Sequence, residues 1–285
     1  MATVMNPPKK GRNYHYSNIS DLKNISSTDM TNPDNQKYWD GILERNQKKD
    51  EWDCNFWFGP EIKTYQEFQN ALNSGWGYGM KQVETMTSKI KMPALESVKR
   101  KTVRGRNGDN LDIHRVNRGE FDRAWSKRKR MSRATKKRFT LTANIGANCD
   151  VDSSVLFWRG VATVSLAKAL IVAGHAVEIV AFTSNNQLTK ENAQMFHTVT
   201  VKTFDSPLNL ASLVAVICLA GFFRTEIFKA WLADPETCRV GLGHAVDKPL
   251  PEKILNHNGQ IIQVPNNLKS ERVVEYWLND IASEI

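Results

Sequence analysis

The sequence has 285 residues, 41% of them hydrophobic, with eight Trp and twelve Phe. This composition can build a sizeable core, so it excludes a largely disordered chain and predicts one large domain or two smaller ones. The formal net charge of +9 favours a negatively charged partner.

The apolar segments and the cysteines exclude two further classes. The N-terminus lacks the apolar segment of a signal peptide, and the longest mostly apolar run, residues 210–223, is 14 residues long. That run is shorter than the ~20 residues that span a bilayer. The cysteines are scattered and follow neither a zinc-ligand spacing nor a disulfide framework; they are Cys54, Cys149, Cys218 and Cys238. We therefore expect a soluble protein of a reducing cytoplasm, with no metal and no membrane partner.

The first 136 residues divide into two parts. Residues 1–50 are rich in Asn, Ser, Asp and Lys without apolar periodicity, which predicts an extended or disordered arm that orders on a partner. Residues 51–136 form the second part. Within it, Thr64 can cap a helix that ends at Gly75, and a second helix is expected over 79–90.

From residue 137 the chain alternates strand and helix patterns. The predicted strands are 138–145, 176–182, 197–204, 238–243 and 260–264. The predicted helices are 153–173, 209–220, 225–232 and 270–281. Strands that alternate with helices indicate an α/β fold with a doubly wound, mostly parallel sheet that is covered on both faces.

The positive charge is concentrated in one segment, residues 99–138. Sixteen of the 39 Lys and Arg residues lie there with only four acids, which gives this segment +12 and leaves about −3 for the rest of the chain. Such a segment predicts a polyanion-binding surface, because each cation placed at a phosphate releases condensed counterions. The predicted nucleic-acid-binding residues are Lys99, Arg100, Lys101, Arg104, Arg106, Arg115, Arg118, Arg123, Trp125, Lys127, Arg128, Lys129, Arg130, Arg133, Lys136, Lys137 and Arg138.

The same residues can have simpler roles than nucleic-acid binding. The run 127–130 can be a solvated tail, and Trp125 can be a core residue rather than a platform on which a base stacks. The interleaved apolar residues are expected to anchor the segment onto a folded body; they are Val103, Leu111, Ile113, Val116, Phe121 and Trp125.

The acids of this segment have two interpretations. Carboxylates and a histidine could hold Mg²⁺ in a nuclease, the candidates being Asp109, Asp112, His114, Glu120 and Asp122. Alternatively, Asp109 lies in a turn after Gly108, and the other acids pair with neighbouring arginines. No dinucleotide-binding, P-loop or nucleophile-elbow motif is present in the sequence, so no catalytic residue is predicted.

The order of strand 138–145, polar loop, long helix and second strand resembles the first third of a von Willebrand factor A domain, as in the chelatase-type partners of ring ATPases. In that family a loop of the form Asp-x-Ser-x-Ser after the first strand holds Mg²⁺. Here the corresponding stretch is 144–148, Asn-Ile-Gly-Ala-Asn, so the resemblance implies a degenerate metal site. Asp150 and Asp152 form a shifted alternative, although Asp152 can simply cap the helix. The resulting domains are the arm 1–50, a small helical and basic nucleic-acid-binding region 51–136, and a von Willebrand A-like domain 137–285.

The segment 108–125, GDNLDIHRVNRGEFDRAW, together with 143–147, resembles a poorly characterised family of phage and phage-derived proteins. This resemblance implies a viral protein of the infected bacterial cytoplasm. A looser similarity is to the single-stranded-DNA-binding proteins by which some phages recruit their own RNA polymerase. We therefore expect a non-enzymatic, single-stranded-DNA-binding cofactor of a phage RNA polymerase or replication protein, without a cofactor of its own. Two alternatives are an adaptor partner of a ring ATPase and a metal-dependent nuclease.

Overall fold

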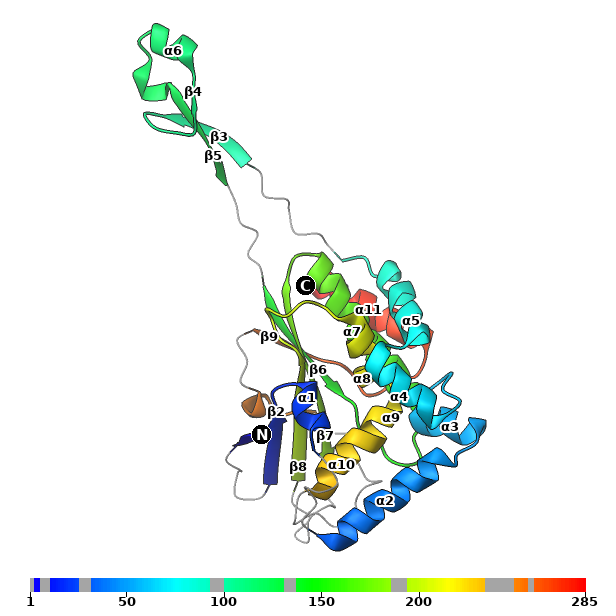
Figure 1. Cartoon of the computed structure of the whole chain (residues 1–285). Helices are drawn as coiled ribbons and strands as arrows, with labels where there is room; N and C mark the ends of the chain where they lie inside the picture. Colours follow the sequence, from blue (N-terminus) through cyan, green and yellow to red (C-terminus); the bar gives the residue numbers. More distant parts are fainter. Residues whose placement is uncertain are drawn as a thin grey trace. The chain divides into compact units, whose positions relative to one another are not determined.

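The computed structural model describes residues 3–5, 11–25, 32–92, 100–130, 137–185, 194–233, 249–255 and 259–285. The chain forms two compact units, which we name the α/β unit (Met1–Pro93 with Arg138–Ile285) and the basic unit (Ala94–Lys137) (Figure 1). The division differs from the predicted domains, because residues 51–93 belong to the α/β unit.

A mixed sheet forms the centre of the α/β unit, in the order β1-β2-β8-β7-β6-β9. Its strands are β1 (Thr3–Met5), β2 (Gly11–Tyr16), β6 (Arg138–Asn144), β7 (Ala176–Asn185), β8 (Gln194–Lys202) and β9 (Gln260–Gln263). The pairs β2–β8, β6–β7 and β6–β9 are parallel, whereas β1–β2 and β7–β8 are antiparallel. The sheet is therefore mostly parallel, as predicted.

The antiparallel pair β7–β8 departs from the predicted doubly wound order. β7 continues to Asn185 and β8 begins at Gln194, so eight residues connect them. A crossover to a parallel neighbour needs at least ~10 residues, and a shorter connection returns the chain antiparallel. The doubly wound arrangement of the von Willebrand type is therefore not confirmed.

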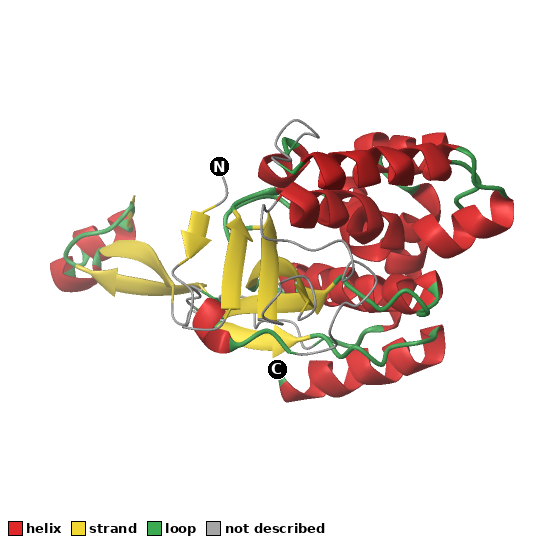
Figure 2. Cartoon of the chain, turned by 90° about the horizontal axis from the view of Figure 1, so that it is seen from below, coloured by secondary structure: helices red, strands yellow, loops and turns green. Residues whose placement is uncertain are grey.

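Helices cover one face of this sheet (Figures 1 and 2). They are α1 (Ile19–Lys23), α2 (Pro33–Gln47), α3 (Glu51–Phe58), α4 (Tyr65–Ser74), α5 (Gly77–Lys89), α7 (Ser153–Val172), α8 (Leu210–Cys218), α9 (Ala220–Phe222), α10 (Phe228–Ala233) and α11 (Glu271–Glu284), with a π-helical turn η3 (Phe223–Ile227) before α10. A 3₁₀ turn, η5 (Glu252–Ile254), follows Leu250, and Leu250 packs with Phe182 and Phe196 in a small second cluster. Because Phe182 follows Ala181, a residue of the main core, this cluster lies on the opposite face of β7.

Helix α7 is the central element of the core, and the sequence predicted its ends closely. Asp152 caps it by accepting a hydrogen bond from the Ser154 amide at 2.8 Å, and Gly174 follows its end with a φ of +98°. At Gly160 a Cβ atom would lie 2.6 Å from the Cα of Cys218, so only glycine allows α8 to approach so closely. By length and hydropathy α7 could also span a membrane, but 72% of its apolar window is buried inside the protein, as in the core helix of a soluble fold.

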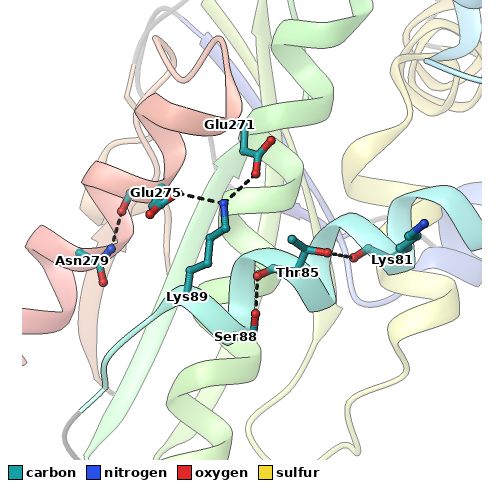
Figure 3. Close-up of polar contacts among 7 residues, drawn as sticks. All are labelled: Lys81, Thr85, Ser88, Lys89, Glu271, Glu275 and Asn279. Atoms are coloured by element: carbon teal, nitrogen blue, oxygen red, sulfur yellow. Dashed lines mark hydrogen bonds and ion pairs between the residues drawn. The ribbon is translucent and has the colours of Figure 1, made fainter.

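Helices α4 and α5 confirm the two helices predicted between residues 64 and 90. Thr64 accepts a hydrogen bond from the Glu67 amide at 3.1 Å, and Gly75 ends α4. Helix α5 packs on α7, where the Ser165 hydroxyl donates to the Val83 carbonyl at 3.2 Å. At its other end Lys89 contacts both Glu271 and Glu275 of α11, at 2.8 and 3.0 Å (Figure 3). These contacts explain why this helical region belongs to the α/β unit.

The prediction of an extended or disordered arm over 1–50 is wrong for the residues that the structure describes. β2 pairs with β8 in parallel register from Gly11 to Tyr16, and α2 buries Trp39 and Ile42 in the core. The arm's polar composition concealed these contacts, because the partners of β2 lie about 180 residues away in the sequence. Of the predicted strands, 238–243 lies outside the described residues.

Candidate nucleic-acid interface

The basic unit is built around a two-stranded ribbon. Strand β3 (Arg100–Gly105) runs antiparallel to β5 (Trp125–Arg130), and the short β4 (Asn110–Leu111) pairs with the other edge of β5. Between β4 and β5 the chain forms helix α6 (Ile113–Asn117) and a 3₁₀ turn, η2 (Phe121–Arg123). This basic segment is thus a regular sheet. We name the residues between β3 and β5, 106–124, the cap; they contain β4, α6 and η2.

Like charges lie directly opposite each other along the ribbon. The register sets Arg100 opposite Arg130 and Lys101 opposite Lys129, while Val103 faces Lys127. Directly opposed like charges destabilise an antiparallel pair. This register therefore makes the pairing of β3 with β5 less stable than a pairing of apolar or oppositely charged residues would be.

By register, the basic positions of the ribbon fall into two groups. Neighbouring positions of a strand alternate between faces, and directly opposed positions share one. The register consequently groups the arginine positions on one face: 100, 104, 128 and 130. The lysine positions 101, 127 and 129 fall on the other face, together with Val103 and Trp125.

The cap is fixed to β5 by backbone contacts. The amides of Asp109 and Asp112 donate to the carbonyls of Ser126 and Ala124, at 2.9 and 2.7 Å. Gly108 lies so close to β5 that a Cβ there would be 2.5 Å from the Ser126 carbonyl oxygen. This turn therefore requires glycine, and it positions the acids of the cap.

Those acids pair with arginines, which confirms the simpler of their two interpretations. Arg106 donates to Asp122, Arg115 Nη1 lies 2.5 Å from Glu120, and Asp112 caps α6 while approaching Arg115 at 3.4 Å. Arg118 lies 3.6 Å from Glu120. Within the described part of the chain, no three His, Cys, Asp or Glu residues gather as metal ligands.

These ion pairs change the list of predicted phosphate contacts. Arg106, Arg115 and Arg118 are engaged inside the basic unit, whereas Arg104, Arg123 and Lys127 are exposed and form no ion pair with a described residue. Lys137 is also exposed. Arg138 begins β6 of the α/β unit and lies 5.2 Å from the ring centre of Phe204. Lys99, Arg133 and Lys136 lie outside the described residues.

Trp125 has a structural position in the basic unit. It begins the central strand β5, opposite Gly105 on one side and Leu111 on the other, and it is half-buried. Base stacking by Trp125 stays a prediction.

The cap exposes apolar side chains that the sequence analysis expected to anchor the segment. Leu111 is 45% exposed, and Ile113 and Phe121 are each 63% exposed. Only Ala124 is fully buried among the described residues of this unit. The sequence predicted that these side chains would be buried, but they belong to a short strand, a one-turn helix and a 3₁₀ turn and are exposed to solvent.

The loop that follows β6 was the other candidate site. Asp152 Oδ1 accepts the Ser154 amide, so the cap interpretation is confirmed, and Asp150 is exposed. The buried Arg159 holds the start of this loop, because its guanidinium donates hydrogen bonds to the carbonyls of Asn144, Gly146 and Asn266 at 2.7, 3.2 and 3.0 Å.

Comparison with known proteins gives one match. A family model described as a domain of unknown function, DUF7192, matches residues 6–276. No curated protein and no solved structure matches the chain.

Proposed function

The chain belongs to the DUF7192 family, a domain of unknown function, and we propose that it binds nucleic acid, without catalysis, through the basic unit. The observation that carries this proposal is the register of the ribbon, which sets Arg100 opposite Arg130 and Lys101 opposite Lys129. A polyanion removes the resulting repulsion and gains counterion release at each contact.

The shape of the ribbon favours a duplex groove. Six residues per strand give a length of about 20 Å at ~3.4 Å per residue. Proteins that bind DNA through a β-ribbon place their strands in the major or the minor groove of a duplex. The expected preference for single-stranded DNA came from a sequence similarity, whereas the regular ribbon favours a duplex.

The apolar side chains of the cap have a role in this arrangement. Minor-groove and architectural proteins insert apolar side chains between base steps and kink the duplex. Phe121 and Ile113 are exposed and lie in the same unit as the cationic ribbon. We assign them to base contacts, while the ribbon contacts phosphates.

The rival functions have less support. The nuclease needs acids that converge on one point, but Asp112, Glu120 and Asp122 are directed at arginines. The ring-ATPase adaptor depends on a doubly wound von Willebrand-like sheet, which the antiparallel β7–β8 pair does not support. A phage RNA polymerase or replication protein as the partner machinery stays a prediction from sequence resemblance.

A charge-matched pair of variants tests the proposal. In the ribbon variant Lys127, Arg128, Lys129 and Arg130 become Gln; in the control the exposed Lys37, Lys81, Lys91 and Lys269 of the α/β unit become Gln. Affinity for a 20-base-pair duplex, measured by fluorescence anisotropy at one salt concentration, should fall roughly 100-fold or more in the ribbon variant, and only a few-fold in the control.

Equal affinities for the two variants would overturn the proposal. The matched single strand, measured in parallel, should bind more weakly than the duplex. A tighter single strand would restore the sequence prediction of a single-strand binder, and Mg²⁺-dependent cleavage of either probe would favour the nuclease.

A further inference from the structure

A cavity of about 230 Å³ lies in the α/β unit, between α2, α3 and the π-helical turn η3. Its charged lining is entirely cationic. Arg45, Lys49 and Arg224 supply three cations, and no Asp or Glu lines the cavity. A cavity with this lining attracts an anion, because nothing in its own wall neutralises the cations.

Arg224 is the buried member of the three. It is 3% exposed, and its guanidinium donates to the carbonyls of Phe56, Trp57 and Val151. Burial lowers its pKa to about 10, although the negative charge of Asp152 opposes this fall. The group thus keeps its charge at neutral pH, and no described carboxylate forms an ion pair with it. A buried cation held by carbonyl dipoles and aromatic rings, without a carboxylate partner among the described residues, is costly, and a bound anion reduces that cost.

Two further donors in the wall lack partners among the described residues. Asn46 is 1% exposed and its Nδ2 has no hydrogen-bond acceptor, and the same holds for Nε1 of the half-buried Trp57. Both residues line the cavity. A buried donor without an acceptor is costly, so a ligand oxygen that accepts a hydrogen bond from either donor would stabilise the complex.

The remaining wall is apolar and limits the ligand's size. Ile42, Phe223 and Phe228 line it and are buried. The π-helical turn that carries Phe223 and Arg224 is a rare element, which often occurs at functional sites. Two of the cations also lie near the Trp57 ring: Lys49 Nζ is 4.6 Å and Arg224 Cζ 5.2 Å from its ring centre.

We infer that this cavity binds a small phosphate monoester, whose phosphate contacts Arg45, Lys49 and Arg224 and whose compact apolar group lies against Ile42, Phe223 and Phe228. This inference is independent of the proposed nucleic-acid binding, because every residue of the cavity belongs to the α/β unit.

The rate at which Cys149 is alkylated reports whether a ligand occupies the cavity. It is exposed and lines the cavity, whereas Cys54 and Cys218 are buried. The full chain is alkylated with iodoacetamide in the presence of phenyl phosphate, benzoate or benzyl alcohol, and each cysteine peptide is quantified by mass spectrometry. Phenyl phosphate should slow the alkylation of Cys149 at least fivefold, benzoate less, and benzyl alcohol not at all.

The variant Arg45→Gln with Lys49→Gln removes two cations without touching the buried Arg224, and Lys37→Gln with Lys81→Gln is its charge-matched control. The first should weaken protection by phenyl phosphate roughly tenfold, and the control should leave it unchanged. Equal protection by benzyl alcohol, stronger protection by benzoate, or full protection in the first variant would overturn the inference. Absence of protection by all three compounds would overturn it as well.

Discussion

Glu120 forms an ion pair with Arg115, with Oε2 2.5 Å from Nη1, and its carboxylate also lies 3.6 Å from the guanidinium of Arg118. One carboxylate thus pairs with two arginines, of which Arg115 also approaches Asp112 at 3.4 Å.

We predict that Glu120→Gln tightens nucleic-acid binding. The substitution keeps the size of the side chain, releases Arg118 for phosphate contact and leaves Arg115 with Asp112 as its one carboxylate partner among the described residues, so the affinity should rise about threefold to tenfold at 100 mM salt. Anisotropy titrations of the same duplex measure it, and Asp40→Asn of α2 is the control. If the carboxylate were a nuclease ligand instead, the substitution would abolish cleavage without tightening binding.

Phe121→Ala should alter the complex without altering the stability of the free protein. The side chain is 63% exposed, so we expect its removal to change the free energy of unfolding by less than ~0.5 kcal/mol. The bend of a bound duplex, measured by energy transfer between end labels, should decrease because the apolar side chain that inserts between base steps is lost. Val172→Ala, at a position 79% exposed in the α/β unit, should leave the bend unchanged. A bend that is identical in the wild type and in Phe121→Ala would remove Phe121 from the interface.

Substitution of glycine by alanine should lower the stability of the protein at Gly160 and raise it at Gly41. At Gly160 a Cβ would lie 2.6 Å from the Cys218 backbone, and such overpacking costs about 1–3 kcal/mol. At Gly41, within α2, no atom lies within 4 Å of the added Cβ, so alanine should stabilise the helix by about 0.5–1 kcal/mol. Urea denaturation of both variants checks the packing of α7 against α8. Equal effects at the two sites would contradict it.

The stability of the protein should depend on His15 in mildly acidic solution. Burial lowers the pKa of His15, and its Nδ1 lies 3.0 Å from Thr198 Oγ1 on the neighbouring strand β8. The unfolded chain therefore binds the proton more readily, and stability falls as the pH drops below the ordinary histidine value of about 6.5 towards the lower value of the fold. His15→Gln should lose less stability than the wild type between pH 7.5 and pH 5. The exposed His114 is the control position, and equal losses in the His15 variant and the wild type would contradict the prediction.

The sequence was sufficient where the signals are local. Thr64 caps the start of one helix and Gly75 ends it. Asp152 and Gly174 mark the start and the end of the long central helix in the same way. These residues act on their own backbone within four positions, so no tertiary information is needed to interpret them.

The sequence failed where long-range pairing determines the structure. β2 has a polar sequence and becomes a strand only because β8 pairs with it. The run 127–130 has no alternation of apolar and polar residues, and it is a strand because residues 100–103 lie opposite. The cation-lined cavity likewise combines residues 45–49 with 224, a grouping that spacing along the chain cannot indicate.

The dependence of affinity on salt tests nucleic-acid binding by the ribbon most directly. The ribbon has seven basic positions, 100, 101, 104 and 127–130. If about six of them meet phosphates of a duplex, the slope of log K against log salt should be about −5. The variant in which the four residues 127–130 are Gln should have a slope shallower by about 3 to 4, and the Lys37, Lys81, Lys91 and Lys269 control should keep the wild-type slope. A wild-type slope shallower than about −2, or the same slope in the ribbon variant, would contradict the account.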